Sequence, residues 1–392
     1  MSRLKVVHAA KFYPPARGGM ETVVGDLCDG TAGDWDVRVV AANDARDGHD
    51  GRRTVRERRA GVDVVRAGTM ATVHSVPLCP SYPFHLWRER ADCVILHEPN
   101  PVAATSVFLR SPARRLVIWH HADLLRPRWA PYTYGHVQRA LYRRADCVIV
   151  SSPNLAAGSA LVATARRVAV IPFGVPLDRY RRTDPARQVT VDRIRAASDG
   201  PHVLFVGRFV YYKGVHVLIE AMASCPGTLL LVGEGPLETS LRERVAALGL
   251  ERRVVFAGQV SDEDLPAYYQ ASDLLVLPSV ARTEAFGVVQ IEAMAAGIPV
   301  VSTNLPTGVP WVNQDGVTGL VVPPEDSAAL GRAIAAVLGD AELRARMGRH
   351  AYARADALFS RQRMIEAFKD VVETAVRAPA ELDAQLARTA VR

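Results

Sequence analysis

The chain of 392 residues is poor in two features that would restrict its class, paired cysteines and long apolar runs. No apolar run reaches the roughly 18 residues that a membrane-spanning helix needs. The five cysteines are scattered, and none has C-x-x-C spacing, so the sequence supports neither a zinc site nor a disulfide framework. The N-terminal segment is too short and too interrupted for a signal peptide. These absences predict a globular protein in a reduced, cytoplasmic setting.

Other signatures are also missing. No G-x-G-x-x-G sequence follows the first predicted strand, which argues against a dinucleotide-dependent enzyme. The chain has no RNP-type aromatic motif, no zinc-finger spacing and no basic helix leading into heptads, so nucleic-acid binding is not indicated. Lysine is scarce, because besides Lys213 the chain has only Lys5, Lys11 and Lys369.

Positive charge is distributed unevenly along the chain. Residues 1–172 contain 24 Lys and Arg against 15 Asp and Glu, whereas the remaining residues contain 24 against 26. A basic half suits a phosphorylated substrate or an anionic membrane surface. The Arg-rich run at 52–59 is interpreted as a solvated loop and strand edge, with contact to a membrane surface as the functional alternative.

Short apolar strands alternate with helical segments along the chain, which is typical of α/β proteins with parallel sheets. Strands are expected at 4–9, 37–41, 62–65, 93–96, 116–119, 147–151 and 168–171, and again at 202–206, 228–232, 254–257, 274–277, 299–302 and 319–322. A connector with two prolines and a glycine at 172–177 separates the two series. We therefore predict two doubly wound, Rossmann-like domains, 1–172 and 173–358, with a ligand cleft where the carboxyl ends of their strands face each other.

Three further segments complete the predicted organisation. The polar, glycine-rich segment 43–59 is expected to be a loop. Apolar residues at helical spacing predict a helix within 359–377. The remainder, 378–392, has no clear partner and is expected to be a frayed tail.

Two acids eight residues apart, Glu284 and Glu292, are the most informative motif. If a helix begins between them, the first lies in the preceding turn and the second lies inside the helix on nearly the same side. Phe286 and Gly287 between them allow amides at a helix N-terminus to point at a polar ligand. This combination suits a molecule with many hydroxyls and a phosphate, although a capped, partly exposed helix explains the acid pair alone.

Other polar groups also follow predicted strands. Gly18 and Gly19 stand at the mouth of the first helix, where backbone can approach a phosphate closely. Arg208 and Lys213 flank a loop that opens a helix, and together they can neutralise a diphosphate. The turn at 258–260 exposes backbone groups suited to the edge of a nucleobase.

Two adjacent histidines and two Asp-x-Asp sequences are further candidate site elements. His120 and His121 end a strand, where a histidine can bond a sugar hydroxyl or orient a substrate. The acids at 34–36 and 262–264 have Asp-x-Asp spacing, but the second follows Ser261, a good N-cap, so capping explains it without a metal. We predict no essential divalent ion and no cofactor.

Taken in order and spacing, these motifs resemble the retaining glycosyltransferases of the GT-B fold, glycosyltransferase family 4 (group 1), in the branch that assembles polysaccharides. The resemblance covers residues 4–375, and its specific part is the loop 207–214, the turn 232–236, the Glu284-x7-Glu292 signature and the stretch 304–324. It implies an N-terminal domain that binds the acceptor, a C-terminal domain that binds a nucleotide-sugar donor, and a C-terminal helix that crosses back to the first domain.

The resemblance also implies roles for individual residues. Arg208 and Lys213 match the pair that binds the donor diphosphate, Glu284 the acid that contacts the sugar hydroxyls, and Glu292 the acid that holds the ribose. The remaining donor-binding positions are Gly18, Gly19, Gly258, Val260, Phe286, Gly287 and Val288. His121 matches a catalytic histidine in a His-x-Asp pattern, with His120 as the alternative register.

The resemblance implies transfer of a hexose from a nucleotide-diphosphate sugar, with GDP-mannose preferred and UDP-sugars as the alternative, to a glycan, lipid-linked or small-molecule acceptor. The expected location is cytoplasmic, with peripheral binding to the inner face of the membrane as a further expectation. No nucleophilic carboxylate is evident, so same-face attack is favoured. The rival functions are a nucleotide-sugar 2-epimerase and a non-catalytic donor-binding subunit. A phosphorylase would need a cofactor lysine that the chain does not supply.

Overall fold

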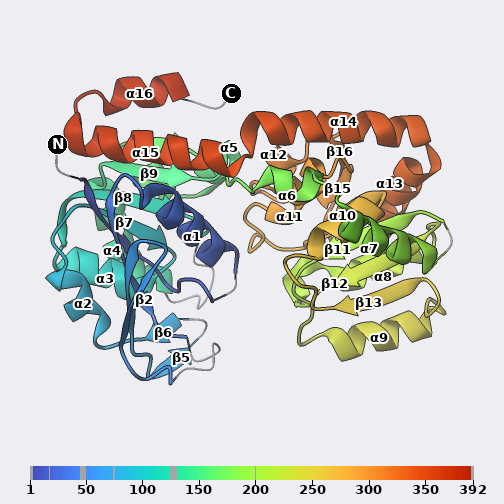
Figure 1. The fold of residues 1–392 in the computed structure, drawn as a ribbon, viewed down its shortest axis with the longest axis horizontal. Coiled ribbons are helices and arrows are strands. Elements are labelled where there is room, and N and C mark those ends of the chain that lie inside the picture. The colour runs from blue at the N-terminus through green and yellow to red at the C-terminus, as the bar shows by residue number, and fades with distance from the viewer. Residues whose placement is uncertain are drawn as a thin grey trace. The chain divides into compact units, whose positions relative to one another are not determined.

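A computed structural model of the protein describes residues 3–16, 18–44, 50–73, 76–123, 130–198 and 200–389 (Figure 1). The chain divides into two compact units. Unit 1 comprises Met1–Phe173 and Gln362–Arg392, and unit 2 comprises Gly174–Arg361. The polypeptide therefore passes between the units twice. Both units have the α/β architecture that the sequence predicts.

Unit 1 is built on an eight-stranded sheet with the order β10-β9-β8-β7-β1-β2-β4-β3. Its strands are β1 (Lys5–Ala9), β2 (Asp36–Ala42), β3 (Val55–Arg59), β4 (Val62–Ala67), β7 (Ala91–Glu98), β8 (Ala113–His120), β9 (Cys147–Val150) and β10 (Val168–Val170). All neighbours are parallel except β3, which runs antiparallel to β4 at the edge. A small hairpin, β5 (Ala71–Val73) and β6 (Val76–Leu78), stands apart from this sheet.

Helices cover both faces of the sheet of unit 1. They are α1 (Gly19–Thr31), α2 (Tyr82–Arg88), α3 (Pro101–Leu109), α4 (Ala130–Arg144), α5 (Pro153–Gly158), α15 (Arg361–Arg377) and α16 (Leu382–Thr389), with a short 3₁₀ turn, η2 (Val162–Thr164). The helices α2, α3 and α4 pack side by side on one face. On the other face, Phe368 of the amphipathic helix α15 contacts the rings of Trp35 and Trp119. This packing places the C-terminal helix on unit 1, as the resemblance implies.

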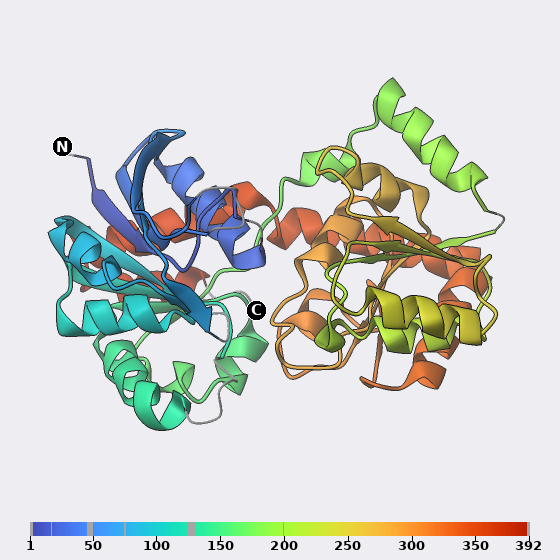
Figure 2. The ribbon, with the colours of Figure 1, turned by 90° about the horizontal axis from the view of Figure 1, so that it is seen from below.

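Unit 2 is built on a six-stranded, fully parallel sheet with the order β13-β12-β11-β14-β15-β16. The strands are β11 (His202–Val206), β12 (Thr228–Val232), β13 (Val254–Gly258), β14 (Leu274–Leu277), β15 (Val300–Thr303) and β16 (Gly319–Val322). The helices are α6 (Leu177–Arg181), α7 (Pro185–Ala196), η3 (Tyr211–Lys213), α8 (Val215–Met222), α9 (Glu238–Ala247), α10 (Leu265–Ala271), α11 (Val288–Ala295), α12 (Val309–Val312), α13 (Ser327–Gly339) and α14 (Ala341–Leu358). Helices lie on both faces of this sheet (Figure 2). The central strands are buried on both sides, which explains why they read as continuous apolar runs.

Two predictions from the sequence are wrong in detail. The segment 43–59 is not loop throughout, because Val55–Arg59 forms the edge strand β3, whose five side chains are exposed and leave no apolar alternation in the sequence. Residues 45–49 of that segment lie outside the described part. Residues 382–389 of the C-terminal stretch do not form a frayed tail, because α16 buries Leu382 completely and packs near β10. An ion pair between Arg167 and Asp383 holds α16 in place.

In the part of the chain that the structure describes, no helix combines the length and apolar character needed to cross a membrane.

Candidate functional site

The strand order of unit 2 creates its principal site. Successive strands run outward from β11 through β12 to β13, and then from β14 through β15 to β16 in the opposite direction. Ligands of doubly wound sheets bind at such a reversal, outside the carboxyl ends of the two central strands. The loops that follow β11 and β14 therefore lie together, and the Val280 N–H donates to the Tyr212 carbonyl at 2.8 Å.

A glycine makes the close approach of these loops possible. Gly214 has φ of 68°, and a Cβ at this position would lie 1.9 Å from the carbonyl oxygen of Pro278. Only a residue without a side chain fits this contact and adopts the left-handed backbone without strain. Gly214 ends the η3 turn and precedes α8, so it also fixes where Lys213 lies.

Lys213 and Glu284 meet at the switch point, one from each loop. The Lys213 Nζ lies 2.6 Å from the Glu284 Oε2, and the two side chains are only 13% and 9% exposed. The Ser279 hydroxyl donates to the same Glu284 oxygen at 3.0 Å. Burial acts to lower the pKa of Lys213, but the neighbouring Glu284 carboxylate outweighs it and the net shift is upward. The site thus holds a charged lysine next to a carboxylate that has further acceptor capacity.

Arg208 lies in the same loop as Lys213 but remains exposed. Its side chain makes no hydrogen bond or ion pair with the residues that the structure describes. Its charge acts on the neighbouring Tyr212, whose pKa it lowers against a larger rise caused by burial. An exposed guanidinium beside a buried ammonium is suited to bind an anion with several oxygens.

The N-terminus of α11 adds backbone donors to this site. Gly287 precedes the helix with φ of 73°, and a Cβ there would lie 2.4 Å from a methyl group of Leu277. The first-turn amides of a helix have no acceptor within it, and the helix dipole favours an anion at this end. Phe286 is buried against Trp311 and Phe359, which anchors the turn before the helix. Val288 is the first helical residue.

Glu292 has a separate environment on the same helix. The Tyr269 hydroxyl donates to the Glu292 Oε2 at 2.5 Å. Burial raises the pKa of Glu292, and hydrogen bonds from Tyr269 and Tyr180 act in the opposite direction. Glu284 therefore lies in the turn before α11 beside Lys213, whereas Glu292 lies inside α11 beside tyrosines from α10 and α6.

Glycines end the three strands on one side of the switch point. The Gly207 N–H donates to the Val232 carbonyl at 2.9 Å, and the Gly233 N–H donates to the Gly258 carbonyl at 2.8 Å. A Cβ at Gly233 would lie 2.2 Å from the carbonyl oxygen of Gly207, so the ends of β11 and β12 are in close contact. Val260 follows this row of glycines and is partly buried.

Unit 1 has its own switch point between β1 and β7. Gly18 and Gly19 follow β1, both are exposed, and they form the N-terminus of α1. A Cβ at Gly19 would meet nothing within 4 Å, whereas one at Gly18 would meet the Glu21 carboxylate. The space in front of Gly19 is thus open to a ligand.

The two adjacent histidines of unit 1 have different partners. The His121 Nε2 lies 3.1 Å from the His97 Nδ1. The His120 Nδ1 lies 2.7 Å from the Tyr142 hydroxyl, and its Nε2 lies 3.5 Å from the Asp123 carboxylate. Burial lowers the pKa of His121 to about 3 and that of His120 to about 4, so both imidazoles are neutral at physiological pH.

Glu98 is a buried acid beside the switch point of unit 1 that is not among the residues singled out from the sequence. It is fully buried at the carboxyl end of β7, where the Tyr134 hydroxyl donates to both carboxylate oxygens at 2.8 and 3.0 Å. The Asn100 N–H donates to it at 2.6 Å. Burial raises the pKa of Glu98 to about 7. The available signal was the sequence His97-Glu98-Pro99 directly after a predicted strand.

Within the described ranges, no group of three or more His, Cys, Asp or Glu side chains is arranged to hold a metal ion. The acids at 262–264 precede α10, and the Ser261 hydroxyl oxygen accepts from the Asp264 N–H at 3.1 Å. Ser261 thus bonds within the turn before α10, but the N-cap of the helix is Asp264, so the prediction of Ser261 as the helix N-cap is wrong in detail.

Comparison with known proteins identifies relatives over almost the whole chain. Residues 187–354 match the family described as glycosyl transferases group 1, and residues 18–174 match the glycosyl transferase 4-like domain. The chain is 32% identical to D-rhamnosyltransferase WbpZ of Pseudomonas aeruginosa strain PAO1, over 91% of this chain and 92% of that protein. It is 30% identical to O-antigen chain mannosyltransferase C of Escherichia coli, over 95% of this chain and 98% of that protein.

A solved structure shares the fold. Sucrose-phosphate synthase from Thermosynechococcus elongatus has a TM-score of 0.78 and 25% identity, and the match covers 96% of this chain and 100% of that chain. Because both the sequence relatives and this structure match across the two units, the chain belongs to the group 1 glycosyltransferases and is an enzyme of the GT-B fold.

Proposed function

We propose that this glycosyltransferase transfers a hexose, with retention of configuration, from GDP-mannose to a hydroxyl group of a glycan or glycolipid during assembly of a cell-surface polysaccharide. The observation that carries the proposal is the Lys213–Glu284 pair at the switch point of unit 2, with the exposed Arg208 in the same loop. A mannosyltransferase and a rhamnosyltransferase among the relatives support a mannose-type sugar.

Each group of the site has a role in donor binding. Arg208, Lys213 and the first amides of α11 bind the diphosphate and stabilise the charge that develops as it leaves. Glu284, which keeps acceptor capacity beyond its bonds to Lys213 and Ser279, accepts hydrogen bonds from sugar hydroxyls.

The rest of the nucleotide is bound by groups around the same sheet edge. Glu292, oriented by Tyr269, accepts from the ribose hydroxyls. Gly258 and Val260 contact the base. In unit 1, the backbone of Gly18 and Gly19, with open space in front of Gly19, binds a phosphate. His121 donates a hydrogen bond to the transferred sugar.

The proposed reaction is a same-face displacement. The bond between the anomeric carbon and the phosphate oxygen breaks with its electron pair going to the phosphate, and the anomeric centre becomes oxocarbenium-like. The acceptor oxygen then bonds to the same face of that carbon, and its proton passes to the departing phosphate oxygen. This scheme requires neither a covalent sugar–enzyme intermediate nor a metal ion.

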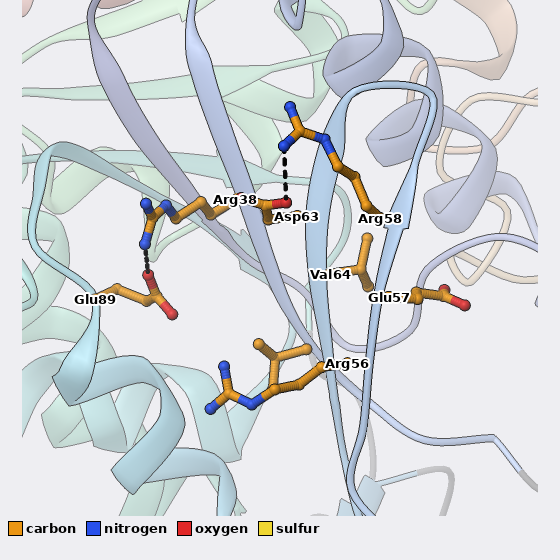
Figure 3. Close-up of a pocket in the computed structure, with 8 residues that line it drawn as sticks. Arg38, Arg56, Glu57, Arg58, Asp63, Val64 and Glu89 are labelled. Atoms are coloured by element: carbon orange, nitrogen blue, oxygen red, sulfur yellow. Dashed lines mark hydrogen bonds and ion pairs between the residues drawn. The ribbon is translucent and has the colours of Figure 1, made fainter.

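Peripheral binding to an anionic membrane is part of the proposal. Arg56 lies on the edge strand β3, and Arg52 and Arg53 precede it. Four large apolar side chains in the segment that follows are 45–67% exposed: Met70 directly before the hairpin, Val73 and Leu78 on the hairpin, and Phe84 on α2. Figure 3 shows that Arg38 and Arg58 near this edge pair with Glu89 and Asp63, whereas Arg56 does not pair with an acid. Basic and apolar side chains together suit a bilayer with anionic lipid.

A thermal-shift experiment against GDP, UDP, dTDP and ADP, with and without magnesium, tests the donor. A ligand that binds only the folded protein raises its melting temperature. A shift with GDP alone, also in EDTA, supports the proposal. A shift with UDP instead shows a UDP-sugar-dependent transferase, and no shift with any nucleotide contradicts the site. Product stereochemistry by NMR tests retention, and donor conversion without acceptor would indicate epimerisation.

Vesicle sedimentation tests the membrane surface. Phe84→Ser combined with Met70→Ser is expected to weaken binding to phosphatidylglycerol vesicles, while neutral phosphatidylcholine vesicles bind neither protein. Leu248→Ser is the control, because Leu248 is a large apolar residue on unit 2 that is also exposed. Equal binding of all variants would contradict this surface.

A further inference from the structure

Three histidines far apart in sequence form one hydrogen-bonded chain in unit 1. The His8 Nδ1 lies 3.0 Å from the His97 Nε2, and the His97 Nδ1 lies 3.1 Å from the His121 Nε2. We call His8, His97 and His121 the histidine relay. The rings are nearly parallel, with interplanar angles of 17° and 26°.

The strand register explains why these residues meet. His8 on β1 pairs with Ile95 on β7, two residues before His97. His97 in turn pairs with Trp119 on β8, two residues before His121. Because residues two apart share a face of a strand, the three histidines lie on one face and step diagonally across neighbouring strands. The relay runs over the switch point between β1 and β7, toward the carboxyl edge of the sheet.

The relay is buried among aromatic side chains around its inner end. His8 and His97 are completely buried and His121 is 5% exposed. Phe368 of α15 lies against the His8 ring, and Trp119 lies parallel to His97 and His121. Burial lowers the pKa of His8 and His121 to about 3 and that of His97 well below its ordinary value, so each ring carries one proton at neutral pH.

Three neutral rings in a row have two proton arrangements that make both hydrogen bonds. Either every ring donates toward His121, or every ring donates toward His8. The His8 Nε2 is buried and has no hydrogen-bond partner among the described residues. Donation toward His8 would leave an N–H at that position, and orphaned buried N–H groups are rare in proteins. Donation toward His121 leaves only a ring lone pair there.

We propose that His8 and His97 are positioning residues that hold His121 in the tautomer with its proton on Nδ1. The His121 Nδ1, which takes no part in the relay, is then a neutral N–H donor. That this N–H donates to the transferred sugar rests on the proposed function, which assigns that role to His121. A neutral donor can bond a hydroxyl without placing positive charge near an oxocarbenium-like centre. The relay is in this respect the counterpart of an acid that fixes the tautomer of a catalytic histidine.

Imidazole ¹⁵N NMR of the full-length protein labelled at histidine tests the tautomer without an activity measurement. Long-range ¹H–¹⁵N correlation distinguishes protonated from unprotonated ring nitrogens, and His121→Asn assigns the signals. We expect His121 to show a protonated Nδ1 and an unprotonated Nε2 between pH 6 and 8. The opposite pattern, or a charged ring, would overturn the proposal.

Two variants test the relay itself. His97→Phe keeps an aromatic ring but removes both bridging nitrogens, and His8→Phe removes only the far end. Each is expected to shift the His121 signals toward a mixture of tautomers and to lower kcat about tenfold, with little change in the KM for the donor. If His97→Phe does not fold, His8→Phe and the wild-type spectrum still decide the question. Unchanged His121 signals in His8→Phe would refute the coupling.

His202→Phe is the matched control. His202 is a buried histidine of unit 2 that contacts Ser198, so its loss tests the general cost of replacing a buried imidazole. In the His202→Phe variant, the NMR signals of His121 and the kcat should match those of the wild type. If the tautomer is as expected but the wild-type protein transfers no sugar from any nucleotide donor, the relay stands and the proposed function fails.

Discussion

The Lys213–Glu284 pair allows a quantitative test of the switch-point site. At 2.6 Å, the attraction between two unit charges is about 6 kcal/mol for an effective dielectric constant near 20. Removing the two charges from water costs several kcal/mol for each ion, and this cost offsets much of the attraction. Glu284→Gln or Lys213→Met leaves one charge buried without its counter-ion, and such a loss typically costs about 3–5 kcal/mol.

A double-mutant cycle separates this interaction from other effects of the substitutions. In Lys213→Met combined with Glu284→Gln, no unpaired charge remains, so we expect it to cost less than the sum of the single variants by about 2–3 kcal/mol. Urea unfolding followed by circular dichroism gives the free energies, with m-values checked because two units need not unfold together. Additivity within about 0.5 kcal/mol would show that the two charges do not stabilise each other.

The same variants separate stability from catalysis. Glu284→Gln and the double variant are both expected to lose transfer, because either removes a group assigned to the donor. The double variant is expected to lose less stability than the two single changes added together. If Glu284→Gln retains transfer at the wild-type rate while folded, the assignment of Glu284 to the donor sugar is wrong.

Three other predictions concern stability. Since burial raises the pKa of Glu98 from 4.5 to about 7, the folded protein keeps a proton that the unfolded chain has released, and stability should fall as pH rises through that window. The free energy of unfolding of Glu98→Gln, measured by urea titration relative to that of the wild type, should rise by about 3 kcal/mol between pH 4.5 and 8. A difference that does not depend on pH would contradict the raised pKa. Gly214→Ala should lower the free energy of unfolding by more than about 3 kcal/mol, because the added Cβ clashes with Pro278. Gly249→Ala is the control, since Gly249 has φ of 63° but open space around it, and it should cost only about 1 kcal/mol. Equal losses would show that the clash at Gly214 is relieved. Phe368→Ala should destabilise unit 1 by about 3–5 kcal/mol, measured by urea unfolding, and a loss below about 1 kcal/mol would refute tight packing of α15.

The sequence alone determined the features that depend on local pattern. Apolar runs of strand length marked all six strands of unit 2, because a parallel sheet buries both faces of its strands. Polar groups directly after those runs marked Arg208, Lys213 and Glu284, since loops at strand ends hold the ligand groups of such sheets. The exposed strand β3 and the helix α16 lacked a signal of this kind. The Arg-rich run 52–59 indicates only a loop and strand edge, and the helix α16 is not indicated at all.

Only the tertiary structure decided which of these groups meet. Lys213 and Glu284 are 71 residues apart in the sequence, and they pair because the strand order places β14 rather than β13 beside β11. His8 and His97 lie on β1 and β7, and His121 directly follows β8. A shift of one residue in either register would turn a ring to the opposite face of the sheet. Strand order and register are set by packing of the whole sheet and its helices, so no local pattern in the chain reports them.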